Sequence, residues 1–213
     1  MNSGKRDFDK AASEWDENPR RLKMAADIAG AIRKSVALSP DMDILDFGCG
    51  TGLLSLHLQP HVRSITGVDS SRGMLDIFDR KIMEHTLKNV KTLHLDVEAG
   101  AALPGPYHLV VSSMTLHHIR DTAVLFHHFH EALLPSGLVC IADLDSENGL
   151  FHSDPTGTFH NGFDRAEFQR VLENAGFSHV TASTAAEIIK PVDRLGDHRF
   201  TVFLITGRKD VSK

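Results

Sequence analysis

Three glycines at alternate positions, Gly48, Gly50 and Gly52, follow a short apolar run that contains one acid, Asp46. Glycine reaches positive φ at little steric cost, so this spacing predicts a tight turn that other residues would form only with strain. The leucines that come next predict a helix, whose N-terminus presents unpaired backbone N–H groups and a positive dipole end. The stretch is therefore typical of a turn that binds a ligand through its backbone.

The glycine spacing and the acid together narrow the class of ligand. A dinucleotide fingerprint has the pattern G-x-G-x-x-G, whereas the third glycine here comes one residue earlier. No lysine follows the glycines, as a phosphate-binding loop would require. A carboxylate at Asp46 would repel a pyrophosphate but attract a ligand that carries an ammonium and a sulfonium group.

The stretch resembles motif I of the class I S-adenosylmethionine (SAM)-dependent methyltransferases, and the resemblance extends over about residues 40–207. Residues 65–69 look like the second strand of that family, which ends in an acid, here Asp69, 21 residues after Gly48. A carboxylate at roughly 20 residues from the glycines meets ribose hydroxyls in this type of fold. Within the family, the chain is similar to the small-molecule enzymes of the ubiquinone/menaquinone C-methyltransferase group.

The resemblance implies a cofactor and an activity. The cofactor would be SAM, with S-adenosylhomocysteine as product, and its methyl group would pass to a small-molecule acceptor by in-line displacement. In the family, an acid such as Asp96 and the next backbone N–H meet the adenine, and a methionine such as Met74 packs against it. The cofactor-binding residues expected on this basis are Asp46, Gly48, Cys49, Gly50, Thr51, Gly52, Asp69, Ser70, Met74, Asp96, Val97 and Ser112.

The histidines supply candidates for chemistry on the acceptor. His117 and His118 follow the fourth predicted strand, at the edge where open α/β sheets bind ligands. Either histidine could orient the acceptor or take its proton, and both are predicted as catalytic, with structural or helix-capping roles as the alternative. The residues predicted to bind substrate are Trp15, Asp143 and His160, of which the last two are also candidate general bases.

A zinc site is not expected. The chain has 14 histidines, and those at 127 and 130 would share one helix face. Zinc needs three or four converging ligands, and no cysteine, histidine or acid completes a set with the usual spacing. No metal ligands are therefore predicted.

The remaining patterns predict the elements that must position these residues. Short apolar runs alternate with helical patterns, which is typical of an α/β fold. Strands are expected at residues 42–47, 65–69, 91–95, 107–113, 138–144, 180–183 and 199–206. This count matches the Rossmann-like, doubly wound, seven-stranded sheet of the resembled family, mostly parallel with an antiparallel last strand and helices on both faces.

Two segments outside this core are expected to border the site. Residues 1–39 would form an N-terminal arm and helix, either packed on the body or, as the family implies, folded over the cofactor as a lid. Residues 40–213 would form the SAM-binding domain. The stretch 145–163 has the composition of a loop, and a loop this long in a compact domain is usually functional or disordered, so we expect it to help form the acceptor pocket.

Composition limits the classes of partner. A formal net charge of −5 disfavours a large nucleic-acid surface, which would need a basic face, and the chain lacks the Asn/Asp-Pro-Pro-aromatic motif of nucleobase amino-methylating enzymes. No run of about 18 apolar residues predicts a membrane span, and no secretory signal is recognised, so a cytoplasmic location is expected. Cys49 and Cys140 are the two cysteines and are expected to act as small buried hydrophobes. The expected partner is a small-molecule methyl acceptor.

Two other functions remain open. A methyltransferase-like protein could hold SAM without catalysing transfer, because the residues of the glycine turn only bind. A nicotinamide-dependent oxidoreductase is disfavoured by the glycine spacing and by the lack of a second substrate domain. The acceptor, the atom that is methylated and the oligomeric state are not encoded in any recognisable motif.

Overall fold

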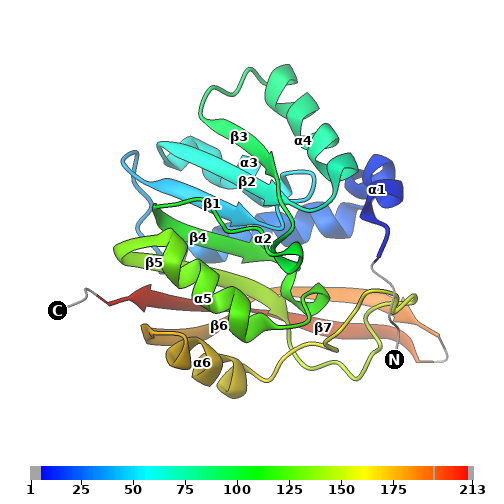
Figure 1. The fold of residues 1–213 in the computed structure, drawn as a ribbon. Helices are drawn as coiled ribbons and strands as arrows, with labels where there is room; N and C mark the ends of the chain where they lie inside the picture. The colour runs from blue at the N-terminus through cyan, green and yellow to red at the C-terminus, as the bar shows by residue number, and fades with distance from the viewer. Residues whose placement is uncertain (1–5, 194, 211–213) are drawn as a thin grey trace.

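The apolar runs of the sequence form the strands of one sheet in the computed structural model, which describes residues 6–193 and 195–210. The strand order is β3-β2-β1-β4-β5-β7-β6 (Figure 1). The strands are β1 (Asp43–Phe47), β2 (Ser64–Asp69), β3 (Val90–His94), β4 (Tyr107–Ser113), β5 (Leu133–Leu144), β6 (Phe177–Val192) and β7 (Gly196–Lys209). Strands β1 to β5 pair in parallel, and β7 pairs antiparallel with β5 and β6. The predicted mostly parallel sheet with an antiparallel last strand is confirmed.

Helices cover both faces of the sheet because its central strands are apolar on both sides. Successive residues of a strand point to opposite faces, so Ile44 and Leu45 of β1, each 0% exposed, belong to different cores. The first core packs under α2 (Pro19–Ser35), α3 (Leu53–Leu58) and α4 (Arg72–Glu84), and the second under α5 (Thr122–Ala132) and α6 (Arg165–Asn174). In Figure 1, α5 and α6 lie in front of the sheet and α2 lies behind it.

The longer helices begin at polar caps that the sequence shows plainly. The side chain of the N-cap residue accepts a hydrogen bond from a backbone N–H of the first turn in α2, α4, α5 and α6; these caps are Asn18, Ser71, Asp121 and Asp164. Each such cap is worth about 1 kcal/mol and satisfies a donor that the helix itself leaves unpaired. The starts of these helices therefore follow from local sequence.

The last strands are longer than predicted. Strand β6 covers Phe177–Val192 and β7 covers Gly196–Lys209, whereas short strands were expected at 180–183 and 199–206. Much of β6 is polar and exposed, so its strand form depends on pairing with β7 and not on a hydrophobic pattern. Strand β5 also begins earlier than the predicted residue 138, at Leu133, because the Pro-Ser-Gly sequence at 135–137 is accommodated where the register against β4 shifts.

The N-terminal segment lies against the edge at which the parallel strands end. It contains α1 (Phe8–Ala11) and a 3-10 helix, η1 (Ala12–Glu17), and leads into α2 (Figure 1). Two further 3-10 helices, η3 (Val97–Ala99) and η4 (Leu116–His118), follow β3 and β4 at the same edge, and η2 (Gln59–His61) follows α3. Within the part of the chain that the structure describes, no helix combines the length and apolar character needed to cross a membrane.

Candidate active site

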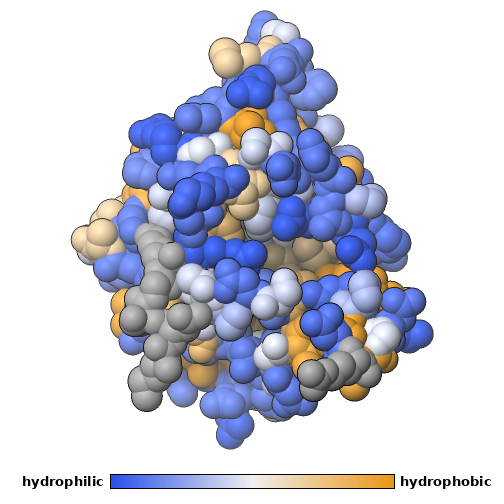
Figure 2. All heavy atoms as spheres, turned by 90° about the vertical axis from the view of Figure 1, so that its right-hand side faces the viewer, coloured by the Kyte–Doolittle hydropathy of each residue, from blue (hydrophilic) through white to orange (hydrophobic). Residues whose placement is uncertain are grey.

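A cavity of about 440 Å³ opens where the parallel strands end. Its walls come from the loops after β1, β2, β3 and β4, from the N-terminal segment, from the loop after β5 and from the end of β6. Figure 2 views this side of the molecule and shows hydrophobic residues within a hollow of a largely hydrophilic surface. The position agrees with the rule that open α/β sheets bind ligands beyond the carboxyl ends of their strands.

The glycine turn after β1 forms one wall and adopts the backbone that its composition predicts. Gly48, Gly50 and Gly52 have φ values of 68°, 53° and 81°, in the left-handed region that side-chain-bearing residues avoid. A Cβ atom on Gly48 would overlap the Thr115 side chain, and one on Gly52 would overlap the Phe78 ring. Gly50 has no heavy atom within 4 Å of that position, so the space above it stays open.

Asp69 at the end of β2 is tied to this turn. Its Oδ2 accepts a hydrogen bond from the Gly50 N–H at 2.8 Å, and its Oδ1 accepts one from the Ser71 N–H at 2.8 Å. The Gly48 N–H also donates to the Val68 carbonyl at 2.8 Å, so the turn and the end of β2 are held together. Burial raises the pKa of the Asp69 carboxyl above its ordinary value.

Asp46 differs from Asp69 because it is almost fully enclosed. Its side chain is 1% exposed, and its Oδ2 accepts a hydrogen bond from the Ser55 hydroxyl at 2.6 Å. Burial raises the pKa of Asp46 to about 7. The acid expected to supply negative charge beside the glycines is thus partly protonated at neutral pH.

Most of the residues predicted to bind the cofactor line the cavity. They are Asp46, Gly48, Cys49, Gly50, Thr51, Asp69, Ser70, Met74, Asp96 and Val97. Two others do not contribute to the lining as described. Gly52 is the N-cap of α3, and the buried Ser112 donates its hydroxyl to the Phe47 carbonyl at 2.9 Å, which joins β4 to β1. Cys49 is buried, and burial raises the pKa of its thiol well above the ordinary value, as expected for a packing residue.

His117 lines the cavity and is held from behind by Asp143. His117 Nδ1 lies 2.6 Å from Asp143 Oδ1, and the second carboxylate oxygen accepts the Leu116 N–H at 2.9 Å. Burial opposes ionisation of Asp143, but the charge and hydrogen bond of His117 outweigh it and lower the pKa of Asp143. Asp143 was predicted to bind substrate, but it is 0% exposed and lies beside His117 without lining the cavity.

His118 and His152 stand beside His117. The His118 Nδ1 lies 2.7 Å from the Gly157 carbonyl oxygen, and the His152 ring centroid is 5.0 Å from that of His117. Burial and the neighbouring histidines lower the pKa of His118 to about 4 and that of His152 to about 3. His152 was not predicted as a site residue. The predicted His160 instead bonds through Nε2 to the Ile119 carbonyl, 2.9 Å away, and lies outside the described cavity lining.

The N-terminal segment forms part of the cavity wall and is anchored at two points. Asp16 accepts a hydrogen bond from the Thr51 hydroxyl at 2.6 Å and forms an ion pair with Lys81. Asp9 accepts hydrogen bonds from the Ser71 hydroxyl at 2.5 Å and from the Gly73 N–H at 2.8 Å. The partners of Asp16 and Asp9 belong to the glycine turn and to α4 with its N-cap, and Thr51 among them also lines the cavity.

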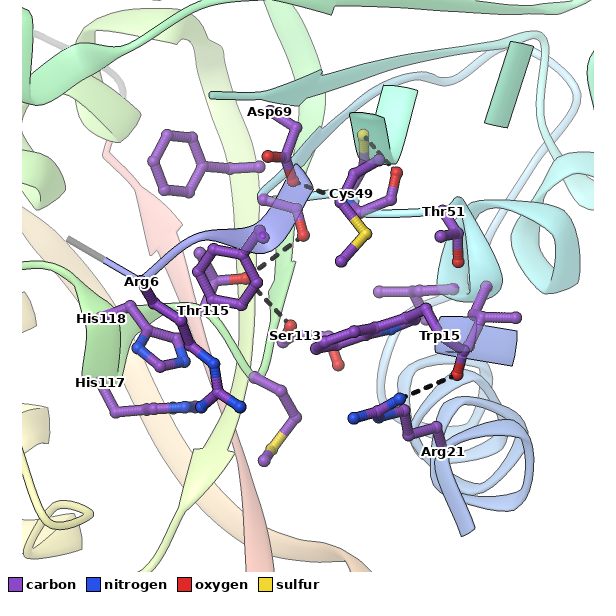
Figure 3. Close-up of a pocket in the computed structure, with 18 of the residues that line it drawn as sticks. Arg6, Trp15, Arg21, Cys49, Thr51, Asp69, Ser113, Thr115, His117 and His118 are labelled. Atoms are coloured by element: carbon purple, nitrogen blue, oxygen red, sulfur yellow. Dashed lines mark hydrogen bonds between the residues drawn. The ribbon is translucent and has the colours of Figure 1, made fainter. Parts of the chain in front are cut away.

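Aromatic side chains of the segment reach into the cavity. Phe8 lies edge-on to His118, with ring centroids 5.1 Å apart, and to Trp15, with centroids 6.0 Å apart. The Arg21 guanidinium lies 3.8 Å from the centroid of the Trp15 ring. Figure 3 shows Arg6, His117 and His118 on one side of the pocket, and Trp15 and Arg21 on the other.

Four basic side chains that the sequence did not single out also line the cavity: Arg6, Arg20, Arg21 and Lys190. Within residues 6–193 and 195–210, none of them forms an ion pair with a carboxylate. Burial and the neighbouring Arg20 lower the pKa of Lys190, and burial and Arg6 lower that of Arg21. The basic stretch at residues 20–23 was the available signal, but nothing local connects it with Lys190 on β6.

This site and sheet define the class I SAM-dependent methyltransferases, in which a glycine turn and acids follow the first strands of a seven-stranded sheet. The chain belongs to the methyltransferase domain family, whose model matches residues 19–182. The prediction of a SAM-dependent methyltransferase is confirmed, whereas these matches do not single out the ubiquinone/menaquinone group.

Relatives in sequence are also methyltransferases. An uncharacterized methyltransferase of Schizosaccharomyces pombe is 30% identical over 175 residues, which cover 75% of this chain and 62% of the yeast protein. Phosphoethanolamine N-methyltransferase 1 of Zea mays is 29% identical over 154 residues, which cover 68% of this chain and 30% of the maize protein. The chain therefore spans less than two thirds of either relative.

Solved structures share the fold. A SAM-dependent methyltransferase from Aquifex aeolicus superposes with a TM-score of 0.68 at 18% identity, covering 94% of this chain and 97% of that one. Phosphoethanolamine N-methyltransferase 2 of Haemonchus contortus, in complex with phosphomonomethylethanolamine and S-adenosylhomocysteine, has a TM-score of 0.69 at 16% identity and covers 85% of this chain and 52% of that one. At such identities, the likeness concerns the fold.

Proposed function

We propose that this chain transfers the methyl group of SAM to a small acceptor that carries an anionic group, such as a phosphate or a carboxylate. The observation that carries the proposal is the division of charge within one cavity. Asp46 lies near the end of β1 and is partly protonated, Asp69 ends β2 and Asp96 comes after β3, whereas basic residues stand on α2 and on β6 at the other edge of the sheet.

The acidic half is suited to SAM. Each oxygen of Asp69 accepts one backbone hydrogen bond, which leaves lone pairs for the hydroxyls of a ribose. The space above Gly50 is open, so the backbone of the turn can approach a ligand closely. Asp96 and Val97 would meet the adenine, and Met74, Cys49, Thr51 and Ser70 would complete the walls around the nucleoside.

The basic half is suited to an anion. Arg21 and Lys190 are partly buried and are brought close to other cations, which costs free energy that an anionic ligand would offset. Arginine and lysine are also the side chains that bind phosphate and carboxylate most strongly. The names of the maize and Haemonchus relatives, both phosphoethanolamine N-methyltransferases, agree with a phosphorylated acceptor.

SAM supplies an electrophilic methyl group on a sulfonium, so the protein has to align the acceptor and exclude water. Of the predicted arm and helix at residues 1–39, the first five lie outside the described residues; we propose that residues 6–39 act as the lid that excludes water, since Phe8 and Trp15 line the cavity. His117 and His118 would contact the acceptor, and Asp143 holds His117 with its Nδ1 proton directed away from the cavity. If the acceptor must lose a proton, His117 Nε2 is the group placed to accept it.

Calorimetry and product analysis test this proposal. S-adenosylhomocysteine should bind the wild type, and Asp69→Asn should weaken that binding by about 10-fold or more, as expected for the loss of charged hydrogen bonds. A panel of small phosphorylated and carboxylated amines and alcohols is then incubated with SAM, and methylated products are followed by mass spectrometry.

The variant Lys190→Gln tests whether acceptor binding and cofactor binding depend on different halves of the cavity. It should raise the KM for an anionic acceptor while leaving the affinity for S-adenosylhomocysteine unchanged, because Lys190 stands on β6, away from the glycine turn. Arg170→Gln, on the exposed side of α6, is the matched control. Turnover only with uncharged acceptors would contradict the anionic class, and tight binding with no turnover would indicate a SAM-binding protein.

A further inference from the structure

Three histidines from separate parts of the chain converge on one point of the cavity wall. One imidazole nitrogen from each of His117, His118 and His152 lies within 4.8 Å of the others. His117 and His118 belong to η4, and His152 belongs to the loop after β5, so packing of that loop on η4 creates the cluster. All three side chains line the cavity.

For two of these histidines, a hydrogen bond from Nδ1 to a neighbouring acceptor fixes the ring orientation and the tautomer. The Nδ1 of His117 faces the Asp143 carboxylate at 2.6 Å, and the Nδ1 of His118 faces the Gly157 carbonyl at 2.7 Å. Both partners can only accept, so each Nδ1 carries a proton, and in the neutral form of each ring Nε2 keeps its lone pair. A carboxylate or a backbone carbonyl behind the ring is the arrangement that supports histidines which bind metal ions.

His152 is held in a different way, by Arg6. The Arg6 guanidinium lies 3.2 Å from His152 Nδ1, and because arginine can only donate, this nitrogen accepts. The proton of the neutral ring is then on Nε2, which is buried without a hydrogen-bond partner among the described residues. A buried polar atom left unpaired costs about 1–3 kcal/mol, so this geometry of His152 is not its most favourable state.

We propose that His117, His118 and His152 bind one divalent metal ion, with zinc as the best match for three neutral imidazoles, and that its remaining coordination position faces the cavity. Zinc–nitrogen distances of about 2.1 Å place tetrahedral ligand atoms roughly 3.4 Å apart, so the cluster, whose nitrogens lie within 4.8 Å of one another, would have to contract by at most about 1.4 Å. Three histidines with one open position are typical of catalytic rather than structural zinc. This step rests on the proposed function: the open position would take the anionic group or the nucleophile of the acceptor, and His117 Nε2, as a metal ligand, would then not accept a proton from the acceptor.

Arg6 and the metal ion compete for His152. A neutral imidazole has one lone pair, and Arg6 uses it in this structure, so metal binding requires Arg6 to withdraw. Arg6 precedes α1, which means that the metal and the N-terminal segment are coupled through one histidine. This competition allows an experiment to distinguish a metal site from an anion site, because Arg6 would weaken the binding of a metal ion and strengthen the binding of an anion.

The test uses the full chain without a polyhistidine tag, stripped with a chelator and titrated with ZnCl2 or CoCl2 in the absence of SAM and acceptor. We expect one equivalent to bind, with the visible d–d absorption of Co²⁺ in a low-coordinate nitrogen site. His117→Ala and His152→Ala should each lose this absorption and bind at least 100-fold more weakly. His130→Ala, a partly buried histidine of α5 outside the cluster, should bind as the wild type does.

Two further variants make the outcome decisive. Asp143→Asn should lower the affinity for metal by about 10–100-fold, as is usual for the group behind a ligating histidine. Arg6→Gln should bind metal more tightly than the wild type. Because Asp143 is buried, circular dichroism and thermal unfolding establish that each variant is folded before binding is compared.

The proposal is overturned if neither the wild type nor Arg6→Gln binds metal in a one-to-one ratio, or if His117→Ala and His152→Ala bind as tightly as the wild type. Binding of inorganic phosphate that is lost in Arg6→Gln and in the histidine variants, without metal binding, would replace the metal site by an anion site. Since these measurements involve neither SAM nor acceptor, they hold even if no methyl transfer is found.

Discussion

Asp46 and Asp69 stand near the ends of neighbouring parallel strands, yet their surroundings give them different properties. Asp69 accepts two backbone hydrogen bonds and is partly exposed at the cavity, whereas Asp46 is enclosed and accepts a hydrogen bond from the Ser55 hydroxyl. At the scale of single residues, burial therefore decides which acid is available as a charged group. Burial likewise explains why Asp143 acts through its hydrogen bond to His117 and does not line the cavity.

Asp46 should make the stability of the protein depend on pH. Its pKa is about 7 in the folded protein, against about 3.9 in an unfolded chain, so the folded state holds a proton that the unfolded state releases. The free energy of unfolding should fall as pH rises from about 4 to about 7, with a slope of at most about 1.4 kcal/mol per pH unit from this group.

The measurement is urea unfolding of the wild type and of Asp46→Asn across this range. The difference between the two curves isolates the group, because the other titrating residues are shared. We expect Asp46→Asn to lose less stability than the wild type as pH rises. Two curves that stay parallel would show that the carboxyl of Asp46 has an ordinary pKa in the folded protein.

The glycine turn gives a second prediction at this scale. Gly52→Ala should destabilise the fold by about 2–4 kcal/mol, because a positive φ costs about 1–2 kcal/mol and the methyl group would overlap the Phe78 ring. Gly50→Ala is the matched control, with a positive φ but no neighbour within 4 Å. Gly50→Ala should lower the free energy of unfolding by only about 1–2 kcal/mol, and it should also weaken the binding of S-adenosylhomocysteine.

Denaturant unfolding and calorimetry on both glycine variants distinguish these effects. Equal losses of stability would mean that Phe78 moves aside without cost, and the overlap would then not explain the glycine at position 52. Unchanged S-adenosylhomocysteine binding in Gly50→Ala would argue against close approach of the cofactor to this turn.

At the scale of elements, the N-terminal segment links the side of the cavity proposed to bind SAM to the side proposed to bind the acceptor. Asp16 anchors it to the glycine turn and to Lys81 of α4, while Phe8 and Trp15 reach the cavity from α1 and η1. Because few contacts hold so short a segment, we expect it to be the part of the site that opens for ligand exchange.

Removing one anchor tests this role. Asp16→Ala should raise the Kd for S-adenosylhomocysteine by about 10-fold, since a charged hydrogen bond contributes about 1.5–3 kcal/mol. It should also speed proteolysis within residues 6–18, with little change in the thermal midpoint. Asp27→Ala is the control, because Asp27 pairs with Lys23 on α2 away from the glycine turn. Proteolysis and binding equal to the wild type would mean that the segment is a fixed part of the fold.

At the scale of the whole molecule, the sheet brings together groups that are distant in the sequence. Lys190 on β6 and Arg20 on α2 share one wall of the cavity, and their mutual repulsion contributes to the lowered pKa of Lys190. Strand β6 reaches this wall because its pairing with β7 continues to Val192, far beyond the strand that its sequence predicted. The division of charge in the cavity is therefore a property of the complete sheet.

The sequence by itself determined the features that depend on near neighbours. Alternate glycines encode a turn because only glycine tolerates positive φ, capping residues such as Asn18 and Asp121 mark helix starts, and continuous apolar runs mark strands buried on both faces. These signals were sufficient to predict the class of fold, the glycine turn and the acids at or after the ends of the first strands.

Only the tertiary structure decided which distant side chains meet. His152 lies 35 residues beyond His117, in a loop without periodic pattern, and its place beside η4 depends on the packing of that loop. His160, in the same loop, turns instead to the Ile119 carbonyl. Local sequence determines backbone conformation, but convergence of side chains is set by long-range packing, whose free energy depends on the whole fold.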